Sequence, residues 1–198
     1  MKSSLFAALA VAPLLIGAAP VAEIESMLAH PKILCGRFDQ TKELVGLKKP
    51  LASNGRFCVV AGKGVLWRSL QPFPSVLKLT RDEILQMDGD RVALRLDAKQ
   101  EPAVRMINGV LFAALAGDLE HLKNLFEIDG GVQNDRWSVT LKPRTAALGK
   151  AVGTIALEGG AYVRNVTIVE ASGDRTKIVF SNIQTGDDAM SAEEAALF

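Results

Sequence analysis

Histidine is scarce in this sequence, and the familiar catalytic motifs are missing. Only His30 and His121 occur. Neither lies at metal-ligand spacing from a second His or a Cys, and the carboxylates of Asp118 and Glu120 share a short predicted helix with His121, where solvation is expected. The sequence contains no G-x-S-x-G nucleophile elbow, no P-loop and no dinucleotide-binding fingerprint. We therefore expect a protein that holds no metal or cofactor and is not an enzyme.

An excess of positive or negative charge is also missing. The 23 Lys and Arg residues, less Lys2 in the N-terminal segment, equal the 22 Asp and Glu residues in number. A balanced chain argues against nucleic acid as a partner and against a polybasic membrane-surface protein. Hydrophobic residues nevertheless make up 48% of the 198 residues, and the mean hydropathy is +0.19. These apolar residues must form a large core or line a cavity.

The N-terminus has the pattern of a secretory signal peptide. Lys2 precedes an apolar run from Leu5 to Ile16, which is too short to span a bilayer, and small residues follow at 17–19. We expect residues 1–19 to be the signal peptide, with the cleavage site left open between about 18 and 22, and 20–198 to form one domain. The alternative is a buried N-terminal helix.

The same segment lacks the cysteine of a bacterial lipoprotein signal. Leu15 has the spacing of the Leu-x-x-Cys box, but Ala18 stands where the lipidated cysteine would be. We therefore expect a periplasmic protein that is soluble and not lipid-anchored.

Cys35 and Cys58 are the only two cysteines, and they fall on neighbouring predicted strands. A register that opposes them directly also places Phe57 across from Gly36, but it sets Arg37 against Arg56, which is unfavourable. The pair is a candidate disulfide in an oxidising compartment. Two separately buried thiols remain the alternative.

Alternating apolar residues and turn signals predict a chain made mostly of strands. A helix is expected at about 21–30, before Pro31, and a second at 102–115 after Pro102. Asp118 is expected to cap a further turn, and Ser191 with Glu194 forms a capping box near the C-terminus. The predicted strands lie at 33–44, 54–61, 64–72, 74–80, 84–87, 91–96, 125–128, 137–143, 154–159, 161–171 and 175–184. The fold class is therefore α+β and mostly β. We expect an unclosed antiparallel β-barrel of about nine to eleven strands with helices covering its concave face.

Several segments together resemble the LolA-like outer-membrane lipoprotein carriers. The matching features are Phe38-x-Gln40-x-Lys42, Ser53-x-Gly55-x-Phe57, Gly64-x-x-Trp67, the Pro72 turn, the strand from Trp137 to Pro143, and TKIVFSNIQTG. They occur in the family's order and cover most of the chain after the signal segment. The pattern Gly46, Leu47, Pro50, Leu51, Ser53, Gly55 is more similar to a divergent branch found with polyene or glycolipid assembly systems.

The resemblance implies an open barrel, lidded by helices, whose apolar cavity shields the acyl chains of lipoproteins or other lipidated molecules. It further implies an inner-membrane release complex that supplies the acylated cargo and an outer-membrane acceptor that takes it. We expect the carrier to act as a monomer. An alternative is a non-transporting envelope module that uses the same sheet for binding.

The candidate lipid-cavity residues lie on apolar faces of alternating strands and on one stripe of the 102–115 helix. The expected cavity wall is Phe38, Phe57, Trp67, Leu94, Leu96, Trp137, Val139 and Phe180. The expected lid residues are Val110, Leu111, Phe112 and Leu115. An ordinary filled core requires the same pattern, so the sequence alone leaves both interpretations open.

Overall fold

The computed structural model describes residues 21–97, 109–110, 112–114 and 118–198. The predicted signal peptide, most of the predicted 102–115 helix, Leu111 and Leu115 lie outside the described residues.

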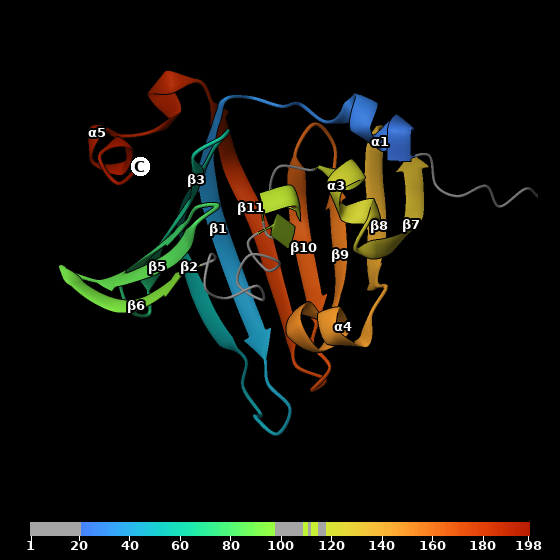
Figure 1. The fold of residues 1–198 in the computed structure, drawn as a ribbon, viewed down its shortest axis with the longest axis horizontal. Coiled ribbons are helices and arrows are strands. Elements are labelled where there is room, and N and C mark those ends of the chain that lie inside the picture. The colour runs from blue at the N-terminus through green and yellow to red at the C-terminus, as the bar shows by residue number, and fades with distance from the viewer. Residues whose placement is uncertain (1–20, 98–108, 111, 115–117) are drawn as a thin grey trace, which may run out of the picture.

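A single sheet of eleven antiparallel strands, not closed into a barrel, forms the body of the protein (Figure 1). Its order is β6-β5-β4-β3-β2-β1-β11-β10-β9-β8-β7. The predicted fold class, an unclosed and mostly β antiparallel architecture, is therefore confirmed. The strands are β1 Ile33–Glu43, β2 Leu51–Val60, β3 Gly64–Gln71, β4 Ser75–Leu79, β5 Glu83–Asp88, β6 Arg91–Asp97, β7 Phe126–Gln133, β8 Arg136–Pro143, β9 Thr154–Gly159, β10 Val163–Val169 and β11 Arg175–Thr185.

The pairing of β1 with β2 gives the sheet two chemically different faces. Cys35 lies directly opposite Cys58, Gly36 opposite Phe57, and Arg37 opposite Arg56, so the register that opposes the two cysteines is confirmed. Successive side chains of a strand point to opposite faces, and directly opposed residues share a face. We call the face that carries Phe57 the inner face, and the face that carries the two cysteines the outer face.

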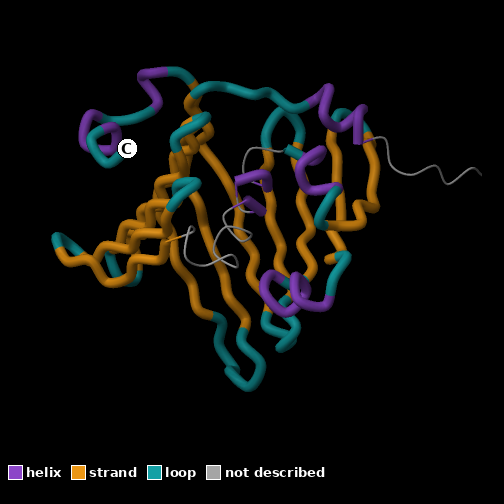
Figure 2. Tube along the Cα trace, in the orientation of Figure 1, coloured by secondary structure: helices purple, strands orange, loops and turns teal. Residues whose placement is uncertain are grey.

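Within the described residues, three short helices and one further helical stretch pack on the inner face (Figures 1 and 2). The helices are α1 Val21–Met27, α3 Leu119–Lys123 and α4 Ala146–Val152. Residues 109, 110 and 112–114 are also helical, and Val110, Ala113 and Ala114 belong to the same buried cluster. The predicted cap on α3 is present, since the carboxylate of Asp118 accepts a hydrogen bond from the backbone N–H of His121 at 2.9 Å.

The C-terminal helix departs from the expectation that helices cover one face. The 3-10 turn η1 Asp187–Ala189 and α5 Ala192–Ala195 pack on the outer face, where Ala189 contacts the buried cluster of Cys35, Cys58 and Leu66. The capping box of Ser191 and Glu194 is formed, as predicted. The sequence predicted this short helix but not the face that it covers, because nothing local in the tail specifies the face.

Candidate functional site

Four aromatic rings meet on the inner face near the centre of the sheet. Phe38 stacks on Trp67 with ring centroids 3.8 Å apart, and Phe57 lies 4.7 Å from Phe180. Trp67 approaches Phe180 edge-on at 6.0 Å. The strand register explains this cluster, because Phe38 opposes Phe180 and Phe57 opposes Trp67. All four were predicted as cavity wall, and the structure brings them together.

Two glycines make room for these rings. Gly55 lies opposite Phe38, and Gly36 lies opposite Phe57. A Cβ atom at Gly55 would stand only 2.8 Å from the Phe38 ring, and one at Gly36 would stand 2.9 Å from the Phe57 ring. Real Cβ atoms do not approach so closely. The Gly-x-Phe spacing in both strands therefore leaves room for the rings across the sheet surface, and at Gly55 it also leaves room for the backbone carbonyl of Arg68.

The predicted wall residues Trp137 and Val139 also face inward but lie on a separate part of the sheet. Both are buried, with Leu141 and Leu157 beside them in the same cluster. The indole Nε1 of Trp137 donates a hydrogen bond to the carbonyl of Gly160 at 2.7 Å. Its polar atom is thus satisfied, and the ring is fixed against β9.

The predicted wall residues of β6 lie at the edge of the sheet and are less covered. Leu94 and Leu96 oppose Gln86 and Ile84 on the inner face, and Leu94 is 41% exposed. The alternation of Val92, Leu94 and Leu96 with more polar or smaller residues predicts all three on one face, and for Val92 this prediction is wrong. A bulge between Gln86 and Met87 shifts the register, so Val92 opposes Met87 on the outer face.

Of the predicted lid residues, the structure describes two. Val110 is buried in the core beneath the helices, and Phe112 is half-buried. Phe112 lines a broad groove of about 660 Å³, which also has polar walls contributed by Lys63, Arg81 and His121. Leu111 and Leu115 lie outside the described residues.

A smaller, mostly apolar cavity of about 140 Å³ opens beside the aromatic cluster. It lies between the end of α1 and the sheet, and its lining is Leu28, Ala29, His30, Pro31, Leu34, Phe57, Val59, Ala61, Tyr162, Val163 and Phe180. Sequence reasoning named only Phe57 and Phe180 of this set. The helical spacing of Leu28 in the N-terminal segment was the available signal for that side of the cavity. No sequence signal placed Tyr162 and Val163 across from Leu28.

The size of this cavity limits what it can hold as it stands. An apolar cavity of about 150 Å³ accommodates a molecule the size of benzene. A longer apolar chain needs side chains or helices on the inner face to move aside. Much of the inner face is filled by the buried cluster, apart from the groove beside Phe112 and the exposed edge at Leu94. The helices α1, α3 and α4 that cover it have five to seven residues each.

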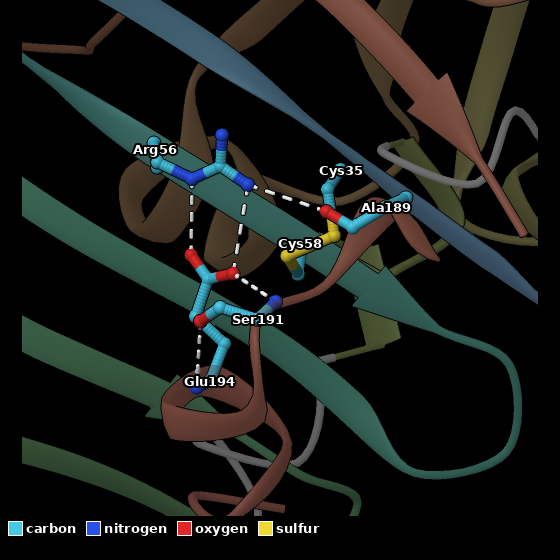
Figure 3. Close-up of a disulfide and its surroundings, with 6 residues drawn as sticks. All are labelled: Cys35, Arg56, Cys58, Ala189, Ser191 and Glu194. Atoms are coloured by element: carbon cyan, nitrogen blue, oxygen red, sulfur yellow. Dashed lines mark hydrogen bonds and ion pairs between the residues drawn. A yellow bond between two sulfur atoms is a disulfide. The ribbon is translucent and has the colours of Figure 1, made fainter. Parts of the chain in front are cut away.

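On the outer face, Arg56 clamps the C-terminal helix beside the disulfide (Figure 3). Its Nε donates to Oε1 of Glu194 at 3.0 Å, and its Nη2 donates to the carbonyl of Ala189 at 3.3 Å. The backbone N–H of Ser191 donates to Oε2 of Glu194 at 2.9 Å. The acid therefore offsets the unfavourable opposition of Arg56 to Arg37 that the register imposes.

Glu194 is charged although its side chain is only 2% exposed. Burial opposes its ionisation most strongly, but hydrogen bonds from Arg56 and Ser191, with the positive charge of Arg56, together hold the pKa below its usual value. Among the residues that the structure describes, no group of three or more His, Cys, Asp or Glu could hold a metal ion.

Comparison with protein families gives one match. The family model described as outer membrane lipoprotein carrier protein LolA matches residues 30–193. No curated protein sequence matches.

Solved structures with similar folds share little sequence. The MucA/MucB complex of Pseudomonas aeruginosa is 14% identical with a TM-score of 0.50, over 89% of this chain and 62% of that chain. A LolA superfamily protein from Nitrosomonas europaea is 7% identical with a TM-score of 0.47, over 84% of this chain and 92% of that chain. A putative outer membrane lipoprotein-sorting protein domain from Vibrio parahaemolyticus is 9% identical with a TM-score of 0.45, over 87% and 93%.

Proposed function

Because the chain belongs to the LolA family of outer membrane lipoprotein carrier proteins, we propose that it shields the acyl chains of lipoproteins or other lipidated molecules in the periplasm. Residues 1–19 serve as its signal peptide, and the domain from 20 onward receives cargo from an inner-membrane release complex and gives it to an outer-membrane acceptor. The family is a carrier family and not an enzyme family.

The aromatic cluster beside the apolar cavity is the observation that carries this proposal. Burying an acyl chain contributes about 0.8 kcal/mol per methylene, so a chain of about fourteen carbons offers on the order of 10 kcal/mol before entropy and reorganisation are subtracted. The existing cavity of about 140 Å³ is too small for such a chain. Cargo therefore enters by displacing apolar contacts that the empty protein makes with itself. This reversible exchange also makes release feasible.

The helical stretch with Val110 and Phe112 is the proposed lid. Phe112 lies at the groove and is only half-buried, so it can change partners at smaller cost than Val110. Phe112→Glu should weaken acyl binding while the protein stays folded, because a carboxylate cannot accompany a lipid chain into an apolar site. If Phe112→Glu bound acyl chains as tightly as wild type does, Phe112 would not be part of the lid.

The large buried cluster on the inner face favours a second candidate, an envelope module that binds a partner without carrying lipid. Glycolipid or polyene-type cargo is a further possibility within the carrier function. Native mass spectrometry of protein purified without detergent distinguishes the first two: a carrier retains bound lipid. An empty protein with no affinity for a fluorescent fatty acid would contradict the carrier function and favour the module.

A further inference from the structure

The turn between β1 and β2 exposes apolar side chains at the end of a projecting hairpin. Val45 is 69% exposed, Leu47 55% and Leu51 52%. We call residues 44–51 the hairpin tip; it is the turn at the bottom of Figures 1 and 2. Apolar side chains that are exposed singly are ordinary, but three within one turn indicate a surface with a binding role.

The hairpin tip extends beyond its neighbour in the sheet. Pairing of β2 with β3 begins at Asn54 opposite Gln71, so the residues from Leu51 to Ser53 run past the end of β3. On the other side, pairing of β1 with β11 continues to Glu43 opposite Arg175. The tip is therefore supported from one side and open on the other.

Specific contacts hold the hairpin tip against the β10–β11 turn. The backbone N–H of Val45 donates to Oδ1 of Asp174 at 2.8 Å, and Nζ of Lys42 lies 2.8 Å from Oε1 of Glu170. A braced tip presents its side chains in a fixed arrangement, which lowers the entropy lost on docking.

The charged side chains of the hairpin tip are basic and exposed to solvent. Lys48 and Lys49 are exposed between Leu47 and Leu51, and among the described residues no ion pair engages either of them. Two nearby acids have other partners, since Glu170 pairs with Lys42 and Asp174 binds the backbone of Val45. A third acid, Glu43, is exposed just before the tip, so the two lysines leave a local surplus of one positive charge over Glu43. The tip thus combines apolar and cationic groups within a few residues.

Other turns with exposed apolar residues lack this combination. Val92 is 50% exposed at the β5–β6 turn, but Asp88 and Asp90 stand beside it. The adjacent Arg91 is paired with Asp88 at 3.5 Å. Phe73 is 80% exposed at the β3–β4 turn, whose residues carry no charge. Charge complementarity therefore singles out the hairpin tip as the place where an anionic apolar surface would bind.

We propose that the hairpin tip docks on the surface of a lipid bilayer that contains anionic lipids. Val45, Leu47 and Leu51 enter the headgroup region, and Lys48 and Lys49 contact lipid phosphates. A protein partner fits less well, because a stable protein interface uses about 20–30 residues on each side. The balanced charge of the whole chain does not oppose this docking, since the basic surplus is local. No helix of the described residues is long and apolar enough to cross a membrane.

Docking at the tip leaves the cavity free. The cavity is lined by residues 28–31, by Leu34 near the start of β1 and by Val59 near the end of β2, at the opposite end of these strands from the tip. Membrane docking and acyl binding are therefore separable properties, and either can fail without the other.

Vesicle flotation tests the proposal. The full chain is expressed, and the N-terminus of the purified protein is sequenced so that every variant compared carries the same one. Wild type should float with vesicles of phosphatidylcholine and phosphatidylglycerol, more weakly with phosphatidylcholine alone, and less at high salt. Lys48→Gln and Lys49→Gln should each weaken binding about fivefold, the effect of about 1 kcal/mol for a lysine near an anionic surface. Leu47→Ser should weaken it about tenfold, because about half the burial of a leucine is lost.

Val92→Ser is the matched control, an equally accessible apolar side chain on an acidic turn, and it should float like wild type. Fluorescent fatty acid binding is measured on the same samples and should be unchanged in the tip variants, whatever its value in wild type. The proposal is overturned if wild type does not float with anionic vesicles, if the tip variants float as well as wild type, or if Val92→Ser weakens flotation as much as Leu47→Ser.

Discussion

Replacing Phe38 with alanine should destabilise the protein and at the same time increase the stabilisation that it gains from a fatty acid. Phe38 is buried, and its ring stacks on Trp67. Truncating a buried phenylalanine costs about 3–5 kcal/mol, since transfer free energy is lost and a cavity remains. For a domain of this size 1 kcal/mol shifts Tm by about 2–4 °C, so Tm should fall by about 6–20 °C.

The assay is thermal unfolding followed by tryptophan fluorescence, with and without excess fatty acid. A ligand at about a hundred times its Kd stabilises the folded state by about 2.7 kcal/mol. In wild type an acyl chain must displace side chains to enter. In Phe38→Ala the vacated space lies next to Phe180, which lines the cavity of about 140 Å³. The rise in Tm caused by fatty acid should therefore be larger in the variant than in wild type.

Leu66→Ala serves as the matched control. Leu66 is buried to the same degree as Phe38, but it lies on the outer face beside the disulfide. This variant should lose about 2–5 kcal/mol of stability. Its rise in Tm on addition of fatty acid should be no larger than that of wild type. If Phe38→Ala gains no more than Leu66→Ala, the inner face is a permanent core and the reasoning is refuted.

Of four further predictions, two concern the clamp of Arg56 and Glu194, one the disulfide and one the cavity. The fold lowers the pKa of Glu194 from its usual value of about 4.5. The charge of Glu194 therefore stabilises the fold fully above about pH 4.5, and this contribution is lost as the pH falls through the lowered pKa. Glu194→Gln should make Tm fall less steeply with decreasing pH, and an unchanged fall would contradict the lowered pKa of Glu194. Arg56→Gln should cost about 1–2 kcal/mol in urea unfolding, the lower part of the range for a buried acid left without its partner, because Arg56 is partly exposed to solvent. Replacing Cys35 and Cys58 together with alanine should lower the free energy of unfolding by about 3 kcal/mol for a loop of this length, and equal stability would show that the bond does not form. Val163→Trp should fill the cavity and weaken displacement of a fluorescent fatty acid, whereas full retention of affinity would place the acyl site elsewhere.

Local signals made much of the fold predictable. Alternation and turn residues identified the strands, and the caps at Asp118 and Ser191 formed as expected because they depend on residues only three positions apart. The register of β1 and β2 followed from opposing the two cysteines. The face to which each other side chain points then follows from the alternation of successive residues along each strand.

Features set by long-range packing or by single extra residues were not predictable. Helix α4 has one buried residue, Leu148, within seven, so it has almost no apolar periodicity, although Thr145 does cap it. The bulge that turns Val92 outward depends on one extra residue in β6. The inner face itself was predicted, but the residues across the cavity from Phe57 come from α1 and β10, which no local pattern brings together.

The order of the strands determines when the chain can finish folding as it is made. Of the strands that the structure describes, β1 is synthesised first and β11 last, yet they are neighbours in the middle of the sheet. Until β11 arrives, β1 lacks one of its two partners and Phe38 lacks Phe180, so neither the central pairing nor the aromatic cluster can form. Pairing between such distant segments is slow, because a long loop must close first. For a chain exported as we propose, this delay keeps the polypeptide open enough to be threaded through a translocation channel, and the core closes only on the far side.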